Sequence, residues 1–464
     1  PPAANGVKVV REGRCMQRKG AWTAVWSPLS LAVTSAVLLE NNHEVILHDC
    51  IVEEIDFNKL RQIIRDFQPE LAVFNVTTPS LASDLSVAKL VHEESAKSVT
   101  AAIGIHGTAL PEEILNIEPD LDVVVRGEPE ITVSDLAAHI NEESDFRTVT
   151  GISYRDKSSI FHNDDRPPLQ ELDKLPFPAW HLVRRDLYVM PFINRQFLLI
   201  ATGRGCPYPC RFCADATYYG KRLRLRSPGR IVDEMEWVQE RFGISDFLFW
   251  AESFTLKPAF ASEVAEEILR RNVKFHWVCN SRVDHVNPEL LQTLKKAGCW
   301  MIGYGIESGS QKTLDILKKG TTLEQAVQAV RWAKDAGLEV TGHCVIGYPG
   351  ESESDIRETI NFTRKIKLDF AQFYCAVPFP GSELYSMALD NNWLTTNDWS
   401  RFEQNFSVLD FPGLSAEKIM ELRANAYRSF YLQPRIIFQS LKRIRRWKDF
   451  VHLIRMSLDF LTWV

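Results

Sequence analysis

The stretch Thr202-Gly-Arg-Gly-Cys-Pro-Tyr-Pro-Cys-Arg-Phe-Cys213 carries three cysteines in the spacing C-x3-C-x2-C. Closed zinc sites and fully ligated iron–sulfur clusters use four protein ligands. Here Cys206, Cys210 and Cys213 supply three thiolates, and the next cysteine, Cys279, lies 66 positions further on. Three thiolates on a 4Fe–4S cluster leave one iron open to a small molecule, so the spacing predicts a reactive centre. The alternatives are a structural zinc knuckle and three unconnected cysteines.

This stretch resembles the signature of radical S-adenosylmethionine enzymes, including the aromatic Phe212 directly before the last cysteine. The resemblance implies a 4Fe–4S cluster whose open iron chelates the amino and carboxylate groups of S-adenosylmethionine. One electron from the cluster then breaks a carbon–sulfur bond and releases a 5′-deoxyadenosyl radical. Because motif matches include false positives, the rest of the chain has to agree with this interpretation.

Length and composition are those of an ordinary globular protein. The chain has 464 residues, enough for two or three domains, with 45% hydrophobic and 25% charged residues. A net charge of −6 gives no general basic field, so we expect no nucleic-acid partner. An oxygen-sensitive cluster points to a reducing cytoplasm, where the six other cysteines stay thiols. The sequence shows no signal peptide and no apolar run long enough for a transmembrane helix.

Short apolar runs alternate with helical patterns over residues 1–150, which predicts a parallel sheet covered by helices on both faces. The predicted strands are Glu44–His48, Leu71–Asn75, Val99–Ile103 and Asp122–Val125. The predicted helices are Leu29–Glu40, Phe57–Asp66, Ser83–Glu94, Pro111–Leu115 and Ile131–Ile140. Domains of this kind usually begin with a strand just before a Pro-Pro such as Pro1-Pro2. The first strand is therefore expected to be missing or supplied by other residues.

Small, polar and Gly-rich residues follow these strands, and alone they fit either a ligand site or ordinary helix caps. A flavodoxin-like domain directly before a radical domain resembles the cobalamin-binding class of radical S-adenosylmethionine enzymes. In that class such loops surround the corrin ring and bury its nucleotide tail. The segments Arg11–Arg14 and Pro28–Leu31 also look like that class. The resemblance assigns ten residues to cobalamin: Thr77, Thr78, Ser80, Gly104, His106, Gly107, Thr108, Arg126, Gly127 and Glu128.

One departure concerns the ligand below cobalt. Many cobalamin domains carry D-x-H-x-x-G, whose histidine ligates cobalt. Counting from Asp49, the histidine position here holds Ile51 and the glycine position holds Glu54. The resemblance therefore implies cobalamin bound without that histidine. His48 and His106 are alternative ligands, although histidines at such positions are more often hydrogen-bonding groups.

A proline-rich, polar linker is expected over residues 151–195, and the β/α alternation then resumes. Six strand candidates predict a partial barrel over residues 196–377, with active-site residues at the carboxyl ends of the strands, by analogy with complete barrels. These strands are Phe197–Thr202, Asp246–Ala251, Lys274–Asn280, Trp300–Ile306, Glu339–Ile346 and Phe370–Ala376. The helices are Arg230–Phe242, Lys257–Arg271, Pro288–Ala297, Leu323–Ala336 and Glu353–Ile366. The cysteine stretch follows the first strand, as this geometry requires.

The strand ends of this barrel carry residue types that match the family's cofactor contacts. Glu252 matches an acid that holds the methionine amino group, although Trp250 and Ala251 replace neighbouring glycines. Arg282 suits a carboxylate because its planar fork donates two parallel hydrogen bonds. Glu307 matches an acid that contacts the cofactor or orients Arg282; the alternative is a simple ion pair of the two inside the barrel. The resemblance assigns six residues to S-adenosylmethionine: Phe212, Glu252, Ser281, Arg282, Glu307 and Ile346.

Residues 378–464 are expected to be mainly helical, with helices at Ala416–Leu432 and Arg435–Val464. The loop Pro378–Tyr385 resembles one that closes the barrel mouth near substrate. Four aromatic residues can wall a substrate pocket or pack in the core: Trp393, Trp399, Phe402 and Phe406. The last thirty residues hold seven basic and two acidic side chains. Such a basic amphipathic helix either lies on an anionic membrane surface or packs on the barrel.

The whole pattern predicts an α/β protein: a Rossmann-like cobalamin-binding domain, a partial (β/α)6 barrel and a helical C-terminal segment. The resemblance implies a methyltransferase that methylates an unactivated carbon of a small-molecule or lipid-like substrate, through the 5′-deoxyadenosyl radical and methylcobalamin. An electron donor such as flavodoxin or ferredoxin is the expected protein partner. No side-chain acid or base is assigned, because the cofactors carry the chemistry. The alternatives are a cobalamin-dependent cyclase or ring-rearranging enzyme, and a sensor without turnover.

Overall fold

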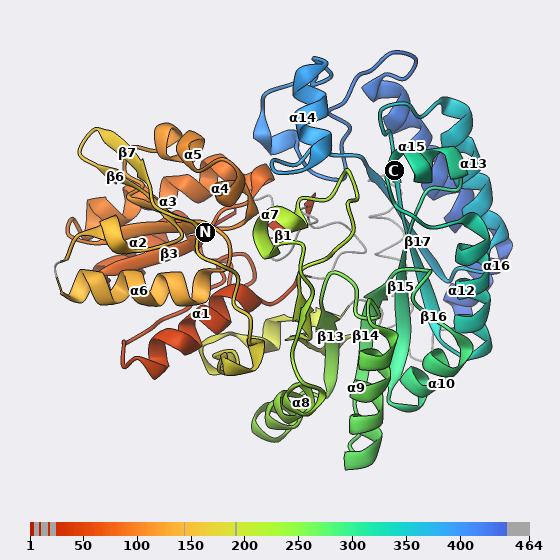
Figure 1. Ribbon diagram of the computed structural model, residues 1–464, viewed down its shortest axis with the longest axis horizontal. Coiled ribbons are helices and arrows are strands. Elements are labelled where there is room, and N and C mark those ends of the chain that lie inside the picture. Colours follow the sequence, from red (N-terminus) through yellow and green to blue (C-terminus); the bar gives the residue numbers. More distant parts are fainter. Residues whose placement is uncertain (4–8, 11–16, 19–24, 143, 191–192, 443–464) are drawn as a thin grey trace.

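A computed structural model describes residues 1–3, 9–10, 17–18, 25–142, 144–190 and 193–442. Two α/β bodies lie side by side, and the C-terminal helices pack against the second (Figure 1). The predicted fold class is confirmed: an N-terminal Rossmann-like sheet precedes a sheet of six parallel strands. The expected contribution of Arg11–Arg14 lies outside the described residues.

The N-terminal sheet has the strand order β3-β4-β5-β6-β7. As predicted, β3 (Leu71–Asn75), β4 (Val99–Ile103) and β5 (Val123–Val125) run parallel. An antiparallel hairpin of β6 (Ile152–Asp156) and β7 (Ser159–His162) extends one edge. This hairpin lies in the stretch expected to be a linker, so we propose that the N-terminal domain continues to about residue 162.

The predicted strand at Glu44–His48 is wrong, because these residues form no ladder with any described strand. In a flavodoxin-like sheet of order 2-1-3-4-5, the second strand pairs only with the first. Within the described ranges no strand lies beside β3 on that edge. The run is followed by a turn in which the Asp49 carboxylate accepts hydrogen bonds from the Ile51 N–H and the Tyr188 hydroxyl.

Both faces of the N-terminal sheet are buried. Phe74, Ala102 and Val124 join one hydrophobic cluster, whereas the residues on either side of them along the chain, such as Ala101 and Val123, join another. This alternation follows from the two-residue repeat of a strand. The helices of this domain are α1 (Leu29–Glu40), α2 (Phe57–Phe67), α3 (Leu81–Glu94), α4 (Ile105–Ala109), α5 (Pro111–Ile117) and α6 (Pro129–Asn141). The strands therefore end at one edge of a rigid layer, where ligands of such sheets bind.

The second sheet is the predicted partial barrel. All six strands are parallel in the order β10-β13-β14-β15-β16-β17. They are β10 (Leu198–Ala201), β13 (Asp246–Trp250), β14 (His276–Ser281), β15 (Cys299–Glu307), β16 (Glu339–Ile346) and β17 (Phe370–Cys375). The outer helices are α8 (Pro228–Phe242), α9 (Pro258–Arg271), α10 (Pro288–Lys296), α11 (Gln311–Ile316), α12 (Leu323–Asp335) and α13 (Glu353–Lys365).

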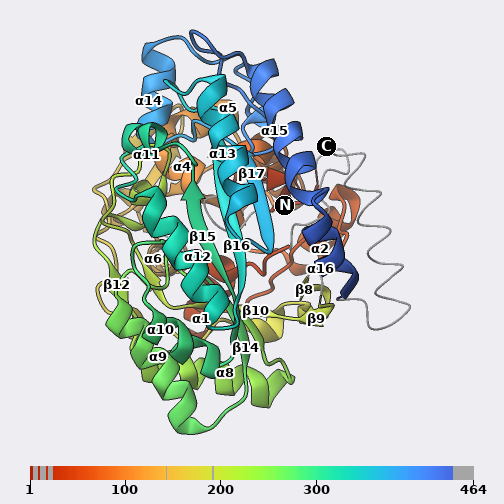
Figure 2. The same ribbon diagram turned by 90° about the vertical axis from the view of Figure 1, so that its right-hand side faces the viewer.

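The C-terminal helix α15 (Ala416–Tyr431) lies along β17 and covers the open edge of the barrel (Figure 2). Arg423 Nε donates to the Phe373 carbonyl at 2.9 Å. The Tyr427 hydroxyl accepts the Phe373 N–H at 3.1 Å, and the Tyr431 hydroxyl donates to the Ala371 carbonyl at 2.8 Å. Residues spaced by four lie on one helix face, so this face satisfies the backbone groups of an edge strand that would otherwise be exposed.

Two further helices complete the described C-terminal segment: α14 (Glu383–Asp390), which the sequence did not predict, and α16 (Pro434–Lys442). The remainder of the helix predicted at Arg435–Val464 lies outside the described residues. No described helix combines the length and apolar character needed to span a membrane.

Candidate active site

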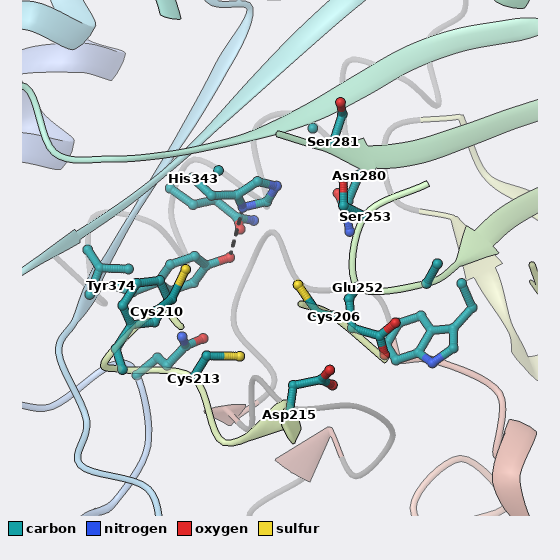
Figure 3. A pocket seen from close by; sticks show the side chains of 18 of the residues that line it. Cys206, Cys210, Cys213, Asp215, Glu252, Ser253, Asn280, Ser281, His343 and Tyr374 are labelled. Atoms are coloured by element: carbon teal, nitrogen blue, oxygen red, sulfur yellow. Dashed lines mark hydrogen bonds between the residues drawn. The ribbon is translucent and has the colours of Figure 1, made fainter. Parts of the chain in front are cut away.

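The three cysteines lie on one loop at the carboxyl end of β10. The loop runs between β11 (Gly203–Arg204) and α7 (Asp215–Tyr219), and β11 pairs with β12 (Arg224–Leu225). Gly205 makes the entry to the loop possible: its φ is +84°, and a Cβ there would lie 2.3 Å from the Arg222 carbonyl oxygen. The three sulfurs surround one space (Figure 3).

A cavity of about 410 Å³ opens directly onto this loop. It is bordered by both α/β bodies. The barrel contributes strand ends and interior side chains, and the N-terminal domain contributes Ser30 of α1, Asn75 at the end of β3, and Gly104 and Ile105 directly after β4. Trp26 also lines the cavity and packs edge-on against Trp250 of β13, with ring centroids 4.8 Å apart. The cavity is therefore an inter-domain site, not a channel through the barrel alone.

The cysteine loop has the donor set for an iron–sulfur cluster with an open position. Cys206, Cys210 and Cys213 are half-buried thiols that line the cavity, and thiolates are the usual ligands of such clusters. Phe212 lines the same wall, 5.7 Å from the Tyr348 ring in the turn after β16. The residues present therefore fit the cluster that the spacing predicts.

Five of the six residues assigned to S-adenosylmethionine line this cavity. Glu252 follows β13, Ser281 ends β14, Arg282 follows it, and Glu307 ends β15; Phe212 faces them from the cysteine loop. Figure 3 shows Glu252 and Ser281 on the wall opposite Cys210 and Cys213. The sixth residue, Ile346, is buried in β16 and does not line the cavity, although its neighbour Val345 does.

Arg282 is held rigidly at the cavity wall. Its Nε and Nη2 donate to the Asp284 carboxylate at 3.0 and 2.8 Å, and Nη2 also donates to the Lys319 carbonyl. The guanidinium carbon lies 3.6 Å from the centre of the Tyr208 ring, which supports the charge through a cation–π contact. The side chain is therefore oriented before any cofactor binds.

Glu307 is paired with a lysine. Lys319 Nζ donates to Glu307 Oε1 at 2.6 Å, and the alternative of an ion pair between Glu307 and Arg282 does not occur. A register shift between β15 and β16 falls at Gly305/Glu307, where Glu307 has φ +63°. Bulges of this kind redirect side chains beside active sites, and a non-glycine residue in the left-handed region is a strained position. No sequence motif around Lys319 indicates that it contacts Glu307.

On the cobalamin side, Gly104 is the assigned residue that borders the cavity. Its φ is +125°, and a Cβ there would lie 2.4 Å from the Val76 carbonyl oxygen. Thr77, Thr78 and Ser80 are buried behind it. The Thr77 N–H and the Ser80 hydroxyl both donate to Asp84 Oδ2, which locks the loop after β3. The glycine is therefore required by its backbone conformation and by the close approach of the residues that end β3.

His106 is a fully buried neutral imidazole next to this loop. Burial lowers its pKa to about 4. Its Nδ1 lies 3.1 Å from the Thr78 hydroxyl, while Nε2 has no hydrogen-bond partner among the described residues. A buried polar atom without a partner fits a bound group or a water near the end of this sheet, although His106 does not line the cavity itself. The other alternative ligand, His48, lies 3.0 Å from Glu53.

The remaining residues assigned to cobalamin make other contacts and do not line the cavity: Gly107, Thr108, Arg126, Gly127 and Glu128. The Thr108 hydroxyl accepts the Gly127 N–H at 3.0 Å. Arg126 donates to the Ser153 hydroxyl at 2.7 Å, and Glu128 pairs with Arg204. Thr108 therefore connects α4, which follows Gly104, to the turn after β5.

Several residues of the barrel interior were missed by the sequence reasoning. Asn280, His343 and Tyr374 point into the cavity (Figure 3). Gly303 lies between two of them, since a Cβ there would be 2.5 Å from Asn280 Oδ1 and 2.8 Å from His343 Nε2. Gln372 and Gln404 also line the cavity. The two-residue repeat of a strand could have indicated the side chains of β16 and β17, but nothing in the sequence marks Gln404.

For the four aromatic residues of the C-terminal segment, the lining of this cavity favours the alternative of core packing. None of Trp393, Trp399, Phe402 and Phe406 is among its lining residues. Trp399 instead packs edge-on against His106, with centroids 4.9 Å apart, and donates to Glu113. The preceding loop does reach the site, because Val377 and Phe379 line it and Glu383 pairs with Arg211 of the cysteine loop at 2.9 Å.

Glu351, in the turn after β16, should make the stability of the fold depend on pH. Its buried carboxyl accepts the Gly347 and Tyr348 N–H groups at 2.8 and 3.1 Å, but burial dominates and raises its pKa to about 8. Because the pKa of this carboxyl is higher in the folded chain than in the unfolded chain, its protonation stabilises the fold. This contribution is fully present at pH values below the unfolded pKa and is lost as the pH rises toward 8. Between pH 6 and 9 the unfolding free energy of the native chain should fall by about 1–3 kcal/mol relative to Glu351→Gln. Anaerobic urea unfolding at both pH values measures it; equal pH slopes would contradict it.

Two family models match this chain, one in each of its two α/β bodies. The radical SAM superfamily model matches residues 200–363, and the B12 binding domain model matches residues 21–137. A Pyrococcus horikoshii protein described as an uncharacterized methyltransferase is 31% identical over 414 residues, covering 89% of this chain and 90% of the relative. The anaerobic magnesium-protoporphyrin IX monomethyl ester cyclase of Rubrivivax gelatinosus is 25% identical, covering 88% and 74%.

Two solved structures share the fold over most of this chain. One is the radical S-adenosylmethionine methyltransferase TsrM from Kitasatospora setae with cobalamin and a [4Fe-4S] cluster bound: TM-score 0.71, 18% identity, 88% of this chain and 87% of that one. The other is the cobalamin-dependent S-adenosylmethionine radical enzyme OxsB with aqua-cobalamin and S-adenosylmethionine bound: TM-score 0.63, 21% identity, 85% and 55%.

The fold, the cysteine loop and the two matched domains define a radical S-adenosylmethionine enzyme with a cobalamin-binding domain. The chain belongs to the cobalamin-dependent radical S-adenosylmethionine methyltransferase family. Its cofactors are a 4Fe–4S cluster, S-adenosylmethionine and cobalamin.

Proposed function

We propose that the enzyme methylates an unactivated carbon of a small-molecule or lipid-like substrate, by way of a 5′-deoxyadenosyl radical. The observation that carries the proposal is that one cavity is bordered by the cysteine loop on one side and by Gly104 on the other. When bound, the cluster supplies the electron that cleaves S-adenosylmethionine, and the corrin cobalt carries the methyl group that is transferred. A substrate between the two loops can be reached by both groups.

The chain's own residues bind and orient. We propose that Cys206, Cys210 and Cys213 hold the cluster, and that Arg282 offers its fixed guanidinium to the methionine carboxylate. Phe212, Glu252, Ser281 and Glu307 complete the contacts to S-adenosylmethionine, while the loop that carries Gly104 accommodates the corrin. Because Glu307 is paired with Lys319, its effect on the cofactor depends on that lysine.

The lining of the cavity supports a largely apolar substrate. Its two described cations are each in an ion pair, Arg282 with Asp284 and Lys319 with Glu307. Much of the wall is aromatic, with Trp26, Trp250, Trp300 and Phe370. Gln404 is 8% exposed, and its Oε1 has no hydrogen-bond partner among the described residues. Its carboxamide suits a neutral hydrogen-bonding group on such a molecule.

The proposal is tested with the reconstituted protein under anaerobic conditions. The protein is incubated with methyl-labelled S-adenosylmethionine, a low-potential reductant and a small-molecule extract of the source cells. Methylation predicts label in a product, with equal amounts of S-adenosylhomocysteine and 5′-deoxyadenosine formed. Deoxyadenosine without S-adenosylhomocysteine would indicate the cyclase or ring-rearranging alternative. The similarity to the Rubrivivax cyclase is the reason to test this alternative. Release of no deoxyadenosine would support a sensor.

The C-terminal helix supports peripheral membrane contact as a second proposal. Ile437, Phe438 and Leu441 of α16 are about half exposed, next to the basic stretch of the C-terminus. A basic helix with exposed apolar side chains can lie on an anionic lipid surface. Deletion of residues 435–464 should then abolish co-flotation with anionic vesicles, measured against neutral vesicles. Equal flotation of the full and shortened chains would reject this contact.

A further inference from the structure

Four charged side chains are buried together where the N-terminal domain meets the cysteine loop; we call them the ion cluster. Glu128 and Glu130 belong to the start of α6, and Arg204 and Arg224 face each other across β11 and β12. Their side chains are 8%, 3%, 10% and 3% exposed, respectively. Buried ion pairs give little stability compared with apolar packing, because desolvation offsets their attraction. Stability therefore does not explain why these four charges are buried together, and a role in fixing the geometry of the domain junction does.

Arg204 is the centre of the ion cluster. Its Nη1 donates to Glu128 at 3.0 Å and to Glu130 at 3.2 Å, and its Nη2 donates to the second oxygen of Glu130. Arg224 pairs with Glu128 at 2.5 Å and donates to the Tyr219 carbonyl of α7 at 2.7 Å. Burial opposes the charge of Arg204, but Glu130 and Glu128 outweigh it and raise its pKa well above the ordinary value. The four groups therefore form one connected set of ion pairs.

The ion cluster connects the two loops that border the cavity. Arg204 stands two residues before Cys206 in the chain. On the other side, α6 begins after a short turn that follows β5, and β5 pairs with β4, the strand that leads to Gly104. The short helices that follow the two loops, α4 and α7, are also in contact (Figure 1). A change in the ion cluster would therefore shift the cysteine loop relative to the loop of Gly104.

We propose that the ion cluster is a positioning device that fixes the separation and orientation of the cobalamin-binding domain and the cysteine loop. A planar guanidinium that donates to two carboxylates accepts few arrangements, whereas apolar surfaces can slide across one another. Glu128, Glu130, Arg204 and Arg224 are then positioning residues, and Glu128 serves cobalamin only indirectly. The inference depends on the two-cofactor site and not on the reaction proposed above.

The test measures a distance and needs no substrate. In the reconstituted protein reduced with dithionite, cob(II)alamin and the reduced cluster each carry an unpaired electron, and pulsed EPR reports the separation between them. The variants are Glu130→Gln, which removes a charge at constant shape, and Arg204→Lys, which removes the planar fork. The matched control is Glu234→Gln, because Glu234 forms a buried pair with Arg226 at 2.6 Å inside the barrel domain. Iron and cobalamin contents are measured in parallel.

The native chain and Glu234→Gln should show one narrow distance distribution, which both ion-cluster variants should lose in favour of a broader one. An unchanged narrow distribution in both variants would overturn the inference. Equal broadening in the control would also overturn it, since the effect would then belong to any buried ion pair. If both variants unfold while the control stays folded, the ion cluster is needed for folding and the positioning role is rejected. Absence of methyl transfer with the expected distances would reject the proposed function and leave this inference intact.

Discussion

Replacing Cys210 with alanine should abolish cluster assembly and the release of 5′-deoxyadenosine. Cys210 is one of three thiols that face the same space, and two thiolates cannot hold the cluster in place of three (Figure 3). Loss of a contact behind a metal ligand already costs about 10–100-fold, so loss of the ligand itself should exceed about 100-fold. Iron content, the visible absorbance of the cluster and deoxyadenosine release after anaerobic reconstitution measure the effect.

Cys344→Ala is the matched control for this substitution. Cys344 is buried in β16 and is not among the residues that line the cavity. The control should keep its iron and its rate, with a stability loss of roughly 1 kcal/mol from the small cavity left behind. Full iron content and an unchanged rate in Cys210→Ala would contradict the assignment. Stoichiometric zinc in the native protein instead of iron would support the zinc-knuckle alternative.

Replacing Gly104 with alanine should prevent cobalamin from binding. The new Cβ would lie 2.4 Å from the Val76 carbonyl oxygen, so the loop has to move, and φ +125° is unfavourable for any side chain. The strained backbone alone costs about 1–3 kcal/mol, and the displaced loop narrows the cavity on the corrin side. Retention of hydroxocobalamin after gel filtration should fall by at least about tenfold, the equivalent of about 1.4 kcal/mol.

Gly413→Ala separates backbone strain from obstruction. Gly413 has φ +90°, but no atom lies within 4 Å of the Cβ that would be added there. This control should lose some stability and keep its cobalamin. If the two variants retain cobalamin equally well, the loop of Gly104 does not border the corrin.

The barrel could be predicted almost residue by residue, because its strands are continuous apolar runs separated by amphipathic helices. Glu339–Ile346 forms β16 as predicted, and the other strands differ only at their ends. The strand predicted at Glu44–His48 failed for a reason that local sequence cannot show: a parallel strand needs a neighbour. Likewise, residues 151–195 were predicted to be a linker, whereas Ile152–Asp156 joins the N-terminal sheet as β6 through antiparallel pairing with β5.

For the site, the sequence indicated which residues lie at the cavity but not which partners they have. Residue types at strand ends placed Glu252, Ser281 and Arg282 at the cavity without any knowledge of contacts. The partners of these residues depend on tertiary packing, so the pairing of Glu307 with Lys319 was not predictable. The charges of Glu128 and Glu130 likewise acquire their role from a loop more than seventy residues away in the chain.

One arrangement of the chain brings together the two loops that we propose hold the cofactors. The cysteine loop and the loop of Gly104 each belong to a separate sheet, yet both border the same cavity. Edge coverage of β17 by α15 and the ion cluster at the domain junction hold that cavity in shape. Binding and positioning are therefore tasks of the protein, and the reactive chemistry is that of the cofactors.

Anomalous diffraction from anaerobic crystals of the reconstituted protein tests the central claim most directly. Data collected at the iron and cobalt absorption edges locate the two metals independently. The account predicts an iron peak between the sulfurs of Cys206, Cys210 and Cys213, and a cobalt peak beside the loop of Gly104, with the cavity between them. A cobalt peak outside that cavity, or an iron peak away from the three sulfurs, would contradict it.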